Sequence, residues 1–258
     1  HQKALKAGNK SLATYLSNLL PASARSTALL MQQLDANPRL LKQTTRFSQQ
    51  SPQMKSVILH GLEKLAMVNA KEALELWHKF DAQQLFADED RVDIKYRIAL
   101  RLLHQNNEAD AQKLVASTPN LTRADLLEWL LRESLRKQDW ERVNEWLARL
   151  PEDARNSERW RYWQARAMEQ LDIKELNGET PMAIYRSVAP ARSFYGFLAA
   201  DKTGETYHLL DRPLAVTEEQ VRQVENAQGM QRAREFFIRG ELGAASREYF
   251  HSARRMPV

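Results

Sequence analysis

Apolar residues recur every three or four positions along most of the chain, which is the period of an amphipathic helix. In the segment 141–150, for example, Val143, Trp146, Leu147 and Leu150 form one continuous stripe. Only the short stretch 206–210 alternates in the manner of a strand. The pattern predicts an all-α fold, with 206–210 as the single candidate strand.

Capping residues mark several helix starts. A proline costs no hydrogen bond at the first helical position, and a polar residue before it can cap the helix. This arrangement occurs at Asn37, Ser51 and Thr180. Thr217 with Gln220 has the spacing of a capping box, and Thr122 with Asp125 is a looser version of it. Each site is predicted to begin a helix.

The middle of the chain repeats itself. Residues 126–151 read as a helix, a short turn at Gln138-Asp139 and a second helix, and residues 94–119 have the same design. Tyr96 precedes Trp129 by 33 residues, and Trp163 follows Trp129 by 34. Helical hairpins of this period cannot bury their apolar faces alone, so successive pairs stack. The repeat predicts an α-superhelix, or solenoid, of helical hairpins.

Composition narrows the possible chemistry. The chain has 258 residues, 43% of them hydrophobic and 28% charged, and its formal charge of +5 mildly favours polyanionic partners. It contains no cysteine, which excludes disulfides, thiolate zinc sites and cysteine nucleophiles. No apolar run approaches the roughly 20 residues of a membrane span. The first residues, which do not include a Met, show no signal-peptide pattern.

Few residues carry a catalytic pattern. The scattered histidines lack metal-ligand spacing, so we expect no metal site; they include His60, His78, His104, His208 and His251. No phosphate-binding glycine loop or nucleophile motif is present. Arg159, Arg161 and Arg166 interleave with aromatic residues and could contact sugars or bases. Trp160 and Trp163, three residues apart on one helix, are expected to belong to the hydrophobic core rather than to contact sugars or bases.

The stretch SFYGFLAA at 193–200 combines aromatic and small residues. Gly196 and Ala200 lie four apart, so they would let a neighbouring backbone approach closely. We expect Phe194, Tyr195 and Phe197 to fill the space around that contact. A sugar contact by Tyr195 is the alternative to this packing role.

Three segments in order carry a resemblance to a known family. Residues 158–171, 192–209 and 230–249 together resemble the soluble lytic transglycosylases of the Slt type. In that family a superhelical U domain forms a ring, a helical linker domain follows, and a lysozyme-like catalytic domain sits on the ring. The resemblance implies a U-like domain over 1–204 and an incomplete linker domain over 205–258, with the catalytic domain absent.

The same resemblance implies the function. Family enzymes cleave the β-1,4 bond between N-acetylmuramic acid and N-acetylglucosamine of peptidoglycan without water, leaving 1,6-anhydro ends. A periplasmic location follows, with peptidoglycan glycan strands, the chain's own catalytic domain and cell-wall proteins as partners. Arg159, Arg161, Arg166 and Tyr195 are the candidate substrate-binding residues.

The family's catalytic glutamate stands in a Glu-Ser-x-Phe motif, followed by Gly-Leu-Met-Gln. Glu133-Ser134 imitates the first half, but Arg136 replaces the phenylalanine and no Gly-Leu-Met-Gln follows. We expect Glu133 to be a solvated glutamate beside Arg136. The chain should therefore have no catalytic residue and no activity alone. We also expect no cofactor.

Two other functions fit a helical-repeat chain. One is an adaptor or scaffold that binds a protein partner or peptidoglycan without enzyme activity. The other is a nucleic-acid binder, which we rank last because basic and acidic residues are mixed throughout the chain.

Overall fold

The computed structural model describes residues 1–49, 51–209 and 215–256. Within these residues it contains α-helices and two short 3₁₀ helices, and no strand, so the all-α prediction is confirmed. Residues 206–209 have no regular structure, which makes the predicted strand wrong there. The last residue of that candidate strand, Leu210, lies outside the described residues.

The chain divides into two units, His1–His208 and Leu209–Val258. The helices of unit 1 are α1 Gln2–Lys6, α2 Lys10–Asn18, α3 Ala22–Ala36, η1 Pro38–Lys42, η2 Thr44–Phe47, α4 Pro52–Val68, α5 Ala70–Asp81, α6 Asp88–His104, α7 Glu108–Ala116, α8 Ala124–Lys137, α9 Trp140–Arg149, α10 Glu152–Arg155, α11 Glu158–Gln170, α12 Pro181–Val188 and α13 Phe194–Thr203. Unit 2 holds α14 Glu218–Asn226, α15 Gln228–Ile238 and α16 Leu242–Ala253. The division falls close to the predicted boundary after residue 204, and the identity of each part as a U-like or linker domain stays a prediction.

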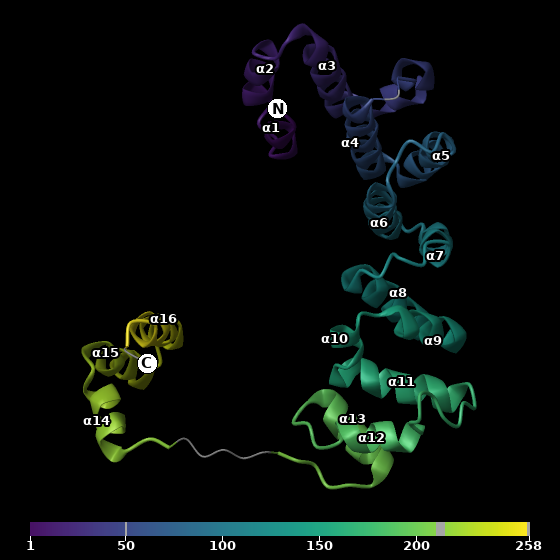
Figure 1. Cartoon of the computed structure of the whole chain (residues 1–258). Coiled ribbons are helices and arrows are strands. Elements are labelled where there is room, and N and C mark those ends of the chain that lie inside the picture. The colour runs from purple at the N-terminus through teal and green to yellow at the C-terminus, as the bar shows by residue number, and fades with distance from the viewer. Residues whose placement is uncertain (50, 210–214, 257–258) are drawn as a thin grey trace. The chain divides into compact units, whose positions relative to one another are not determined.

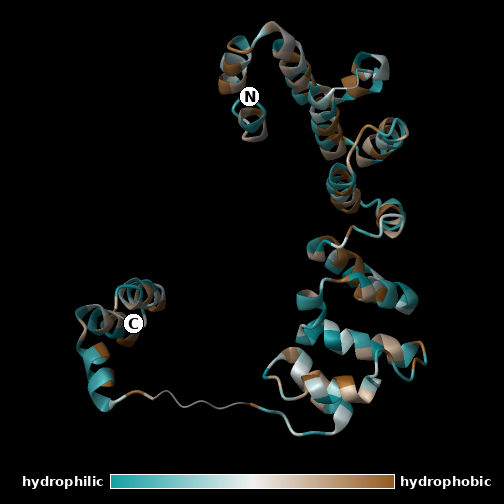
Figure 2. Cartoon of the chain, viewed as in Figure 1, coloured by the Kyte–Doolittle hydropathy of each residue, from teal (hydrophilic) through white to brown (hydrophobic). Residues whose placement is uncertain are grey.

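Unit 1 is a succession of helical hairpins. Each helix from α3 to α9 packs against the next, apart from the step between α7 and α8, and α4, α6 and α8 also stack on one another. These three lie on one side of the unit, and α5, α7 and α9 lie on the other (Figure 1). Both hydrophobic and hydrophilic residues occur on most helices (Figure 2), as amphipathic packing requires.

Two hydrophobic cores run through unit 1, and α11 contributes to both. The larger core extends from α1 to α11 and includes the fully buried Trp77, Trp146 and Trp160. The smaller core joins α11, α12 and α13 around Tyr162 and Tyr185. Trp163 is half-buried and packs against both cores, so the expected core role of the Trp160–Trp163 pair is confirmed.

Most of the predicted caps form. Ser51 and Thr180 accept hydrogen bonds from backbone N–H groups of α4 and α12, and Thr217 with Gln220 makes a complete capping box. Asn37 caps a 3₁₀ helix rather than an α-helix. Thr122 makes no cap, because α8 begins at Ala124 after Arg123, so that prediction is wrong.

The hairpin of α8 and α9 shows how the predicted repeat closes. Gln138 adopts a left-handed conformation with φ of 56°, which ends α8. Asp139 then accepts a hydrogen bond from the Arg142 N–H at 3.1 Å and starts α9. The turn at 138–139 therefore lies where the sequence predicts it.

Unit 2 is a three-helix unit with very little core. Helix α15 packs against α14 and α16, yet Ala233 and Ala245 are the only buried apolar residues of unit 2 among those described. Gly229 allows close packing there, since an added Cβ would lie 1.9 Å from Ser252 Oγ. Most of the larger apolar side chains of this unit are exposed.

Candidate functional site

Helix α11 carries all three candidate arginines, but it directs them to different sides. Seven residues make almost two helical turns, so Arg159 and Arg166 share a face. Arg161, two residues after Arg159, points to nearly the opposite side. The three guanidinium groups therefore cannot act as one basic cluster.

Arg161 is committed to an ion pair. Its two Nη atoms donate to the two carboxylate oxygens of Glu179 at 2.6 and 2.7 Å, and Nη2 also reaches Ser187 Oγ at 3.3 Å. This hydrogen bonding raises the pKa of Arg161 above its ordinary value and lowers the pKa of Glu179. The side chain of Arg161 is 17% exposed. Its ion pair with Glu179 joins α11 to the segment before α12.

Arg166 belongs to a hub around Glu169. One oxygen of Glu169, Oε2, accepts hydrogen bonds from Arg166 at 2.6 Å, Tyr185 at 3.0 Å and Lys202 at 3.2 Å. Burial alone would raise the pKa of Glu169, but these three donors outweigh burial and lower it. Burial and the bond to Glu169 raise the pKa of Tyr185. The hub joins α11, α12 and α13.

The third candidate arginine, Arg159, lies at the surface beside Phe194 and Tyr195 of α13. We call these three residues the Arg159 platform. The Arg159 guanidinium lies 5.9 Å from the ring centroid of Tyr195 and has no carboxylate partner among the described residues. Phe194 is 68% exposed and meets the ring of Tyr195 edge-on at 5.3 Å. A cation beside two aromatic rings can contact both apolar and hydroxyl-bearing surfaces.

A row of aromatic rings supports the platform from behind. Tyr195 lies 5.8 Å from Tyr162, which lies 5.5 Å from Trp163, and Trp163 lies 6.5 Å from Trp140. The rings come from α9, α11 and α13. Sequence reasoning did not single out Trp140, or Phe194 as an exposed residue. The signal for Phe194 was its place in the first turn of a helix, directly after the capping Ser193.

The stretch 193–200 packs closely, although not as expected. A Cβ on Gly196 would lie 1.9 Å from the Ala191 carbonyl oxygen, so the close approach is to the segment before α13. Ala200 is fully buried. Phe194 points into solvent rather than filling the contact, so its predicted packing role is wrong, while Phe197 packs 5.3 Å from the ring of Tyr207.

Glu133 has the surroundings of an ordinary helix-surface glutamate. Its Oε2 atom lies 2.5 Å from the Arg136 guanidinium one turn further along α8, as expected. The carboxyl is less solvated than predicted, since 17% of its side chain is exposed. The carboxyl therefore belongs to a local ion pair within α8.

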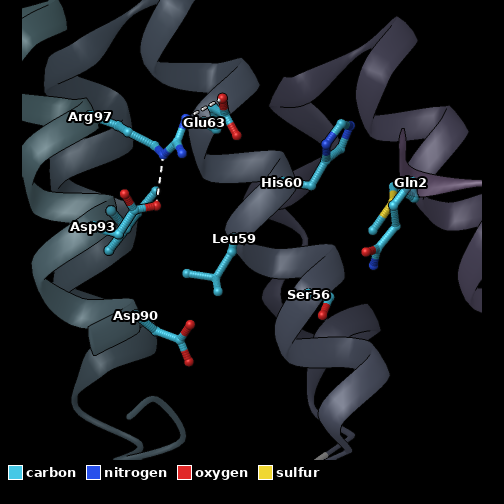
Figure 3. Close-up of a pocket in the computed structure, with 10 residues that line it drawn as sticks. Gln2, Ser56, Leu59, His60, Glu63, Asp90, Asp93 and Arg97 are labelled. Atoms are coloured by element: carbon cyan, nitrogen blue, oxygen red, sulfur yellow. Dashed lines mark hydrogen bonds and ion pairs between the residues drawn. The ribbon is translucent and has the colours of Figure 1, made fainter. Parts of the chain in front are cut away.

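An acidic groove lies between α4 and α6 of unit 1 (Figure 3). Its volume is about 190 Å³, and its lining includes Glu63, Asp90 and Asp93. Arg97 spans the groove and pairs with Glu63 at 2.9 Å and Asp93 at 2.8 Å. Two of the three carboxylates are thereby neutralised, so the groove is held together by its own ion pairs.

The histidines occupy separate places. His60 is buried and lies 3.4 Å from Asp35, and the ring of His104 meets Trp129 edge-on at 4.7 Å. In the described part of the chain, no three His, Cys, Asp or Glu residues come together as a metal site would require. None of the helices there combines the length and apolar character that a bilayer crossing needs.

The fold defines the class first: a superhelix of helical hairpins followed by a small helical unit. No protein-family model matches the chain. The soluble lytic murein transglycosylase of Escherichia coli strain K12 is 30% identical over 213 residues, which is 80% of this chain and 32% of that protein. The Salmonella typhimurium protein of the same name is 28% identical over 210 residues.

The solved structures that are similar to this chain are also those of lytic transglycosylases. An inactive mutant of the lytic transglycosylase Slt from Pseudomonas aeruginosa is 36% identical with a TM-score of 0.70, covering 98% of this chain and 41% of that one. The 70-kDa soluble lytic transglycosylase of Escherichia coli, at 24% identity and a TM-score of 0.69, shares the fold.

The chain is homologous to one part of the soluble lytic murein transglycosylases, which confirms the resemblance seen in its sequence. It spans about a third of the length of the curated relatives it matches. That coverage supports a non-catalytic part of such an enzyme.

Proposed function

We propose that this chain is the glycan-holding superhelix of a periplasmic soluble lytic transglycosylase, with a U-like domain over 1–204 and linker-like helices over 205–258. The homology to murein transglycosylases carries this proposal. The whole enzyme would cleave the β-1,4 bond between N-acetylmuramic acid and N-acetylglucosamine to give 1,6-anhydro ends. We place that chemistry in the part of the enzyme that the matched segment does not cover.

The Arg159 platform is the proposed glycan contact. Sugar rings have an apolar face that can lie against Phe194, and hydroxyl or carboxylate groups that can accept hydrogen bonds from Arg159. The aromatic row behind Tyr195 fixes the platform in place. Arg161 and Arg166, which were also candidates, would act indirectly by holding α11 against α12 and α13.

Binding to purified, protein-free sacculi tests the proposal. We expect Phe194→Ala and Arg159→Gln each to weaken sacculus binding about fivefold, the loss typical of one exposed stacking or cation contact. Met182→Ala and Arg186→Gln are matched controls, since both side chains are exposed on neighbouring α12. The controls should leave binding unchanged, and the chain alone should release no anhydro-sugar fragments.

The adaptor function predicts a different outcome. It is favoured by the exposed apolar groove of unit 2, which Met230, Phe237, Leu242 and Tyr249 line. Failure of the unmodified chain to bind sacculi would contradict the glycan-holding proposal and leave the adaptor function. Release of anhydro-sugar ends by this chain alone would contradict the placement of the chemistry elsewhere.

A further inference from the structure

The outward face of α16 in unit 2 is a cationic surface. Arg247, His251 and Arg254 lie at positions i, i+4 and i+7, which places them along one side of the helix. Ala245 and Ser252 lie on the opposite side, where Ala245 is buried and Ser252 meets Gly229 of α15. The cationic side therefore faces away from the rest of unit 2.

These arginines have no carboxylate partner among the described residues. In contrast, Arg232 of α15 reaches across to Glu248 of α16 and pairs with it at 2.6 Å. Glu248 is the only carboxylate in the middle of α16, and this pair occupies it.

The cationic face also has a shape. It forms a shallow hollow of about 400 Å³ in which the aromatic ring of Phe250, itself exposed, lies among the cations. The lining consists of Ser246, Arg247, Phe250, His251, Arg254 and Arg255. It includes no acidic residue, so an anionic group entering the hollow meets no side chain of its own charge.

We propose that this face binds the free carboxylate groups on the peptide part of peptidoglycan. This inference rests on the proposed function, because it extends the contact with the cell wall from unit 1 to unit 2. The planar fork of a guanidinium matches a carboxylate, and an α-helix rises 1.5 Å per residue. Arg247 and Arg254 are thus separated by about 10.5 Å along the axis, which suits a ligand carrying repeated carboxylates.

Phe250 explains why a peptide fits better than a bare anion. A ring among cations offers an apolar contact to the alkyl parts of a short peptide, while the arginines hold its carboxylates. A small inorganic anion would leave the ring unused. Anionic lipid is the alternative source of negative charge, and the experiment below separates it.

The test combines two changes, one on each partner. Sacculi are used either native or with their free carboxylates converted to uncharged amides, and the full chain is compared with Arg247→Gln/Arg254→Gln. We expect amidation and the double substitution each to weaken binding about fivefold, as loss of two exposed charge pairs should. On amidated sacculi the two proteins should bind equally, since the interacting partners have already been removed.

Arg234→Gln/Arg239→Gln is the matched control. It removes the same charge from two exposed arginines outside this hollow, Arg234 in α15 and Arg239 directly after it, so it should bind native sacculi like the unmodified chain. An equal loss in the control would show that net charge alone matters and would overturn the proposal. Circular dichroism confirms that each variant keeps its helices.

Other outcomes separate this inference from the proposed function. Binding of the unmodified chain that amidation leaves unchanged would overturn the carboxylate site while preserving the glycan-holding function. No binding to native sacculi would overturn both. Binding to phosphatidylglycerol vesicles that Arg247→Gln/Arg254→Gln abolishes, with sacculus binding unaffected, would assign the face to lipid phosphate and also overturn the proposal.

Discussion

At the scale of single residues, two glutamates hold the α11–α13 end of unit 1 together. Glu179 receives both arms of Arg161, and Glu169 receives Arg166, Tyr185 and Lys202. Both carboxylates must be ionised to accept these bonds fully. The pKa of each is lowered, so folding and ionisation are linked at these two positions.

This linkage predicts a loss of stability in acid. A carboxyl whose pKa is lowered by folding stabilises the folded state above its unfolded pKa and loses that contribution as pH falls through the folded pKa. We expect the contribution of Glu179 to be about 1 kcal/mol at pH 7, because the carboxylate is partly exposed, and to disappear as pH falls below its ordinary value of 4.5. Urea unfolding at pH 7 and at pH 3.5 measures it.

Glu179→Gln should lower the free energy of unfolding at pH 7 and make it less dependent on pH in acid. Glu175→Gln is the control, since Glu175 lies in the same segment, is exposed and has no partner among the described residues. Equal pH dependence in Glu179→Gln and the unmodified chain would contradict the prediction.

The sequence could separate the candidate arginines only in part. Helical periodicity alone places Arg161 on a different side from Arg159 and Arg166. It could not supply the partner of Arg161, because Glu179 lies eighteen residues further on, in a segment without helical pattern. The direction of Phe194 depends similarly on where α13 begins, which the cap at Ser193 fixes only to within a residue or two.

At the scale of elements, the start of α13 depends on one glycine. Gly196 sits in the first turn of α13, where its N–H donates to Ser193 Oγ at 3.1 Å. The backbone at Ala191 passes so close that no side chain fits there. Two of the three residues of the Arg159 platform lie in this same turn. The geometry of the platform therefore depends on the close contact between Gly196 and the backbone at Ala191.

Gly196→Ala should therefore destabilise unit 1 by about 2 kcal/mol, the cost of forcing extra volume into a packed contact. The added Cβ meets a backbone carbonyl at 1.9 Å, which cannot move aside as a side chain can. Gly61→Ala is the comparison, because its Cβ meets the movable end of Leu34 at 2.9 Å. Thermal unfolding should show the larger decrease for Gly196→Ala, and a larger decrease for Gly61→Ala would contradict this account.

Most helices could be predicted because their signals are local. The Ser51, Thr180 and Thr217 caps use atoms within three residues, and the turn at Gln138-Asp139 closes a hairpin between neighbouring helices. Thr122 failed for a tertiary reason. Asp125, its expected partner, instead accepts a hydrogen bond from Tyr96 of α6 at 2.5 Å. A contact between successive hairpins thus replaced a local one.

At the scale of the whole molecule, the repeat predicted the superhelix because each hairpin packs mainly on its neighbours in sequence. The repeat could not predict that the core divides at α11, where Trp160 joins one cluster and Tyr162 the other. Nor could it predict the cationic face of α16, since that depends on which residues α15 covers. Local periodicity gives the helices, and only packing decides which side chains stay exposed.

The unequal cores of the two units predict two unfolding transitions. Unit 1 buries many large side chains, including Trp77, Trp146 and Trp160, whereas unit 2 buries only Ala233 and Ala245 among its described apolar residues. Burial of apolar area is the main source of stability, at about 25 cal/mol per Å². We therefore expect calorimetry to show unit 2 unfolding at a lower temperature than unit 1.

Variants in each unit assign the transitions. Gly229→Ala places a Cβ 1.9 Å from Ser252 Oγ, so it should lower only the first transition, while Glu179→Gln should lower only the second. The Ser252 hydroxyl can rotate away but its Cβ, 2.6 Å from the new atom, cannot, which makes the effect on unit 2 unavoidable. A single transition that both variants shift would mean that the two units unfold together, and the small core of unit 2 would then not set its stability.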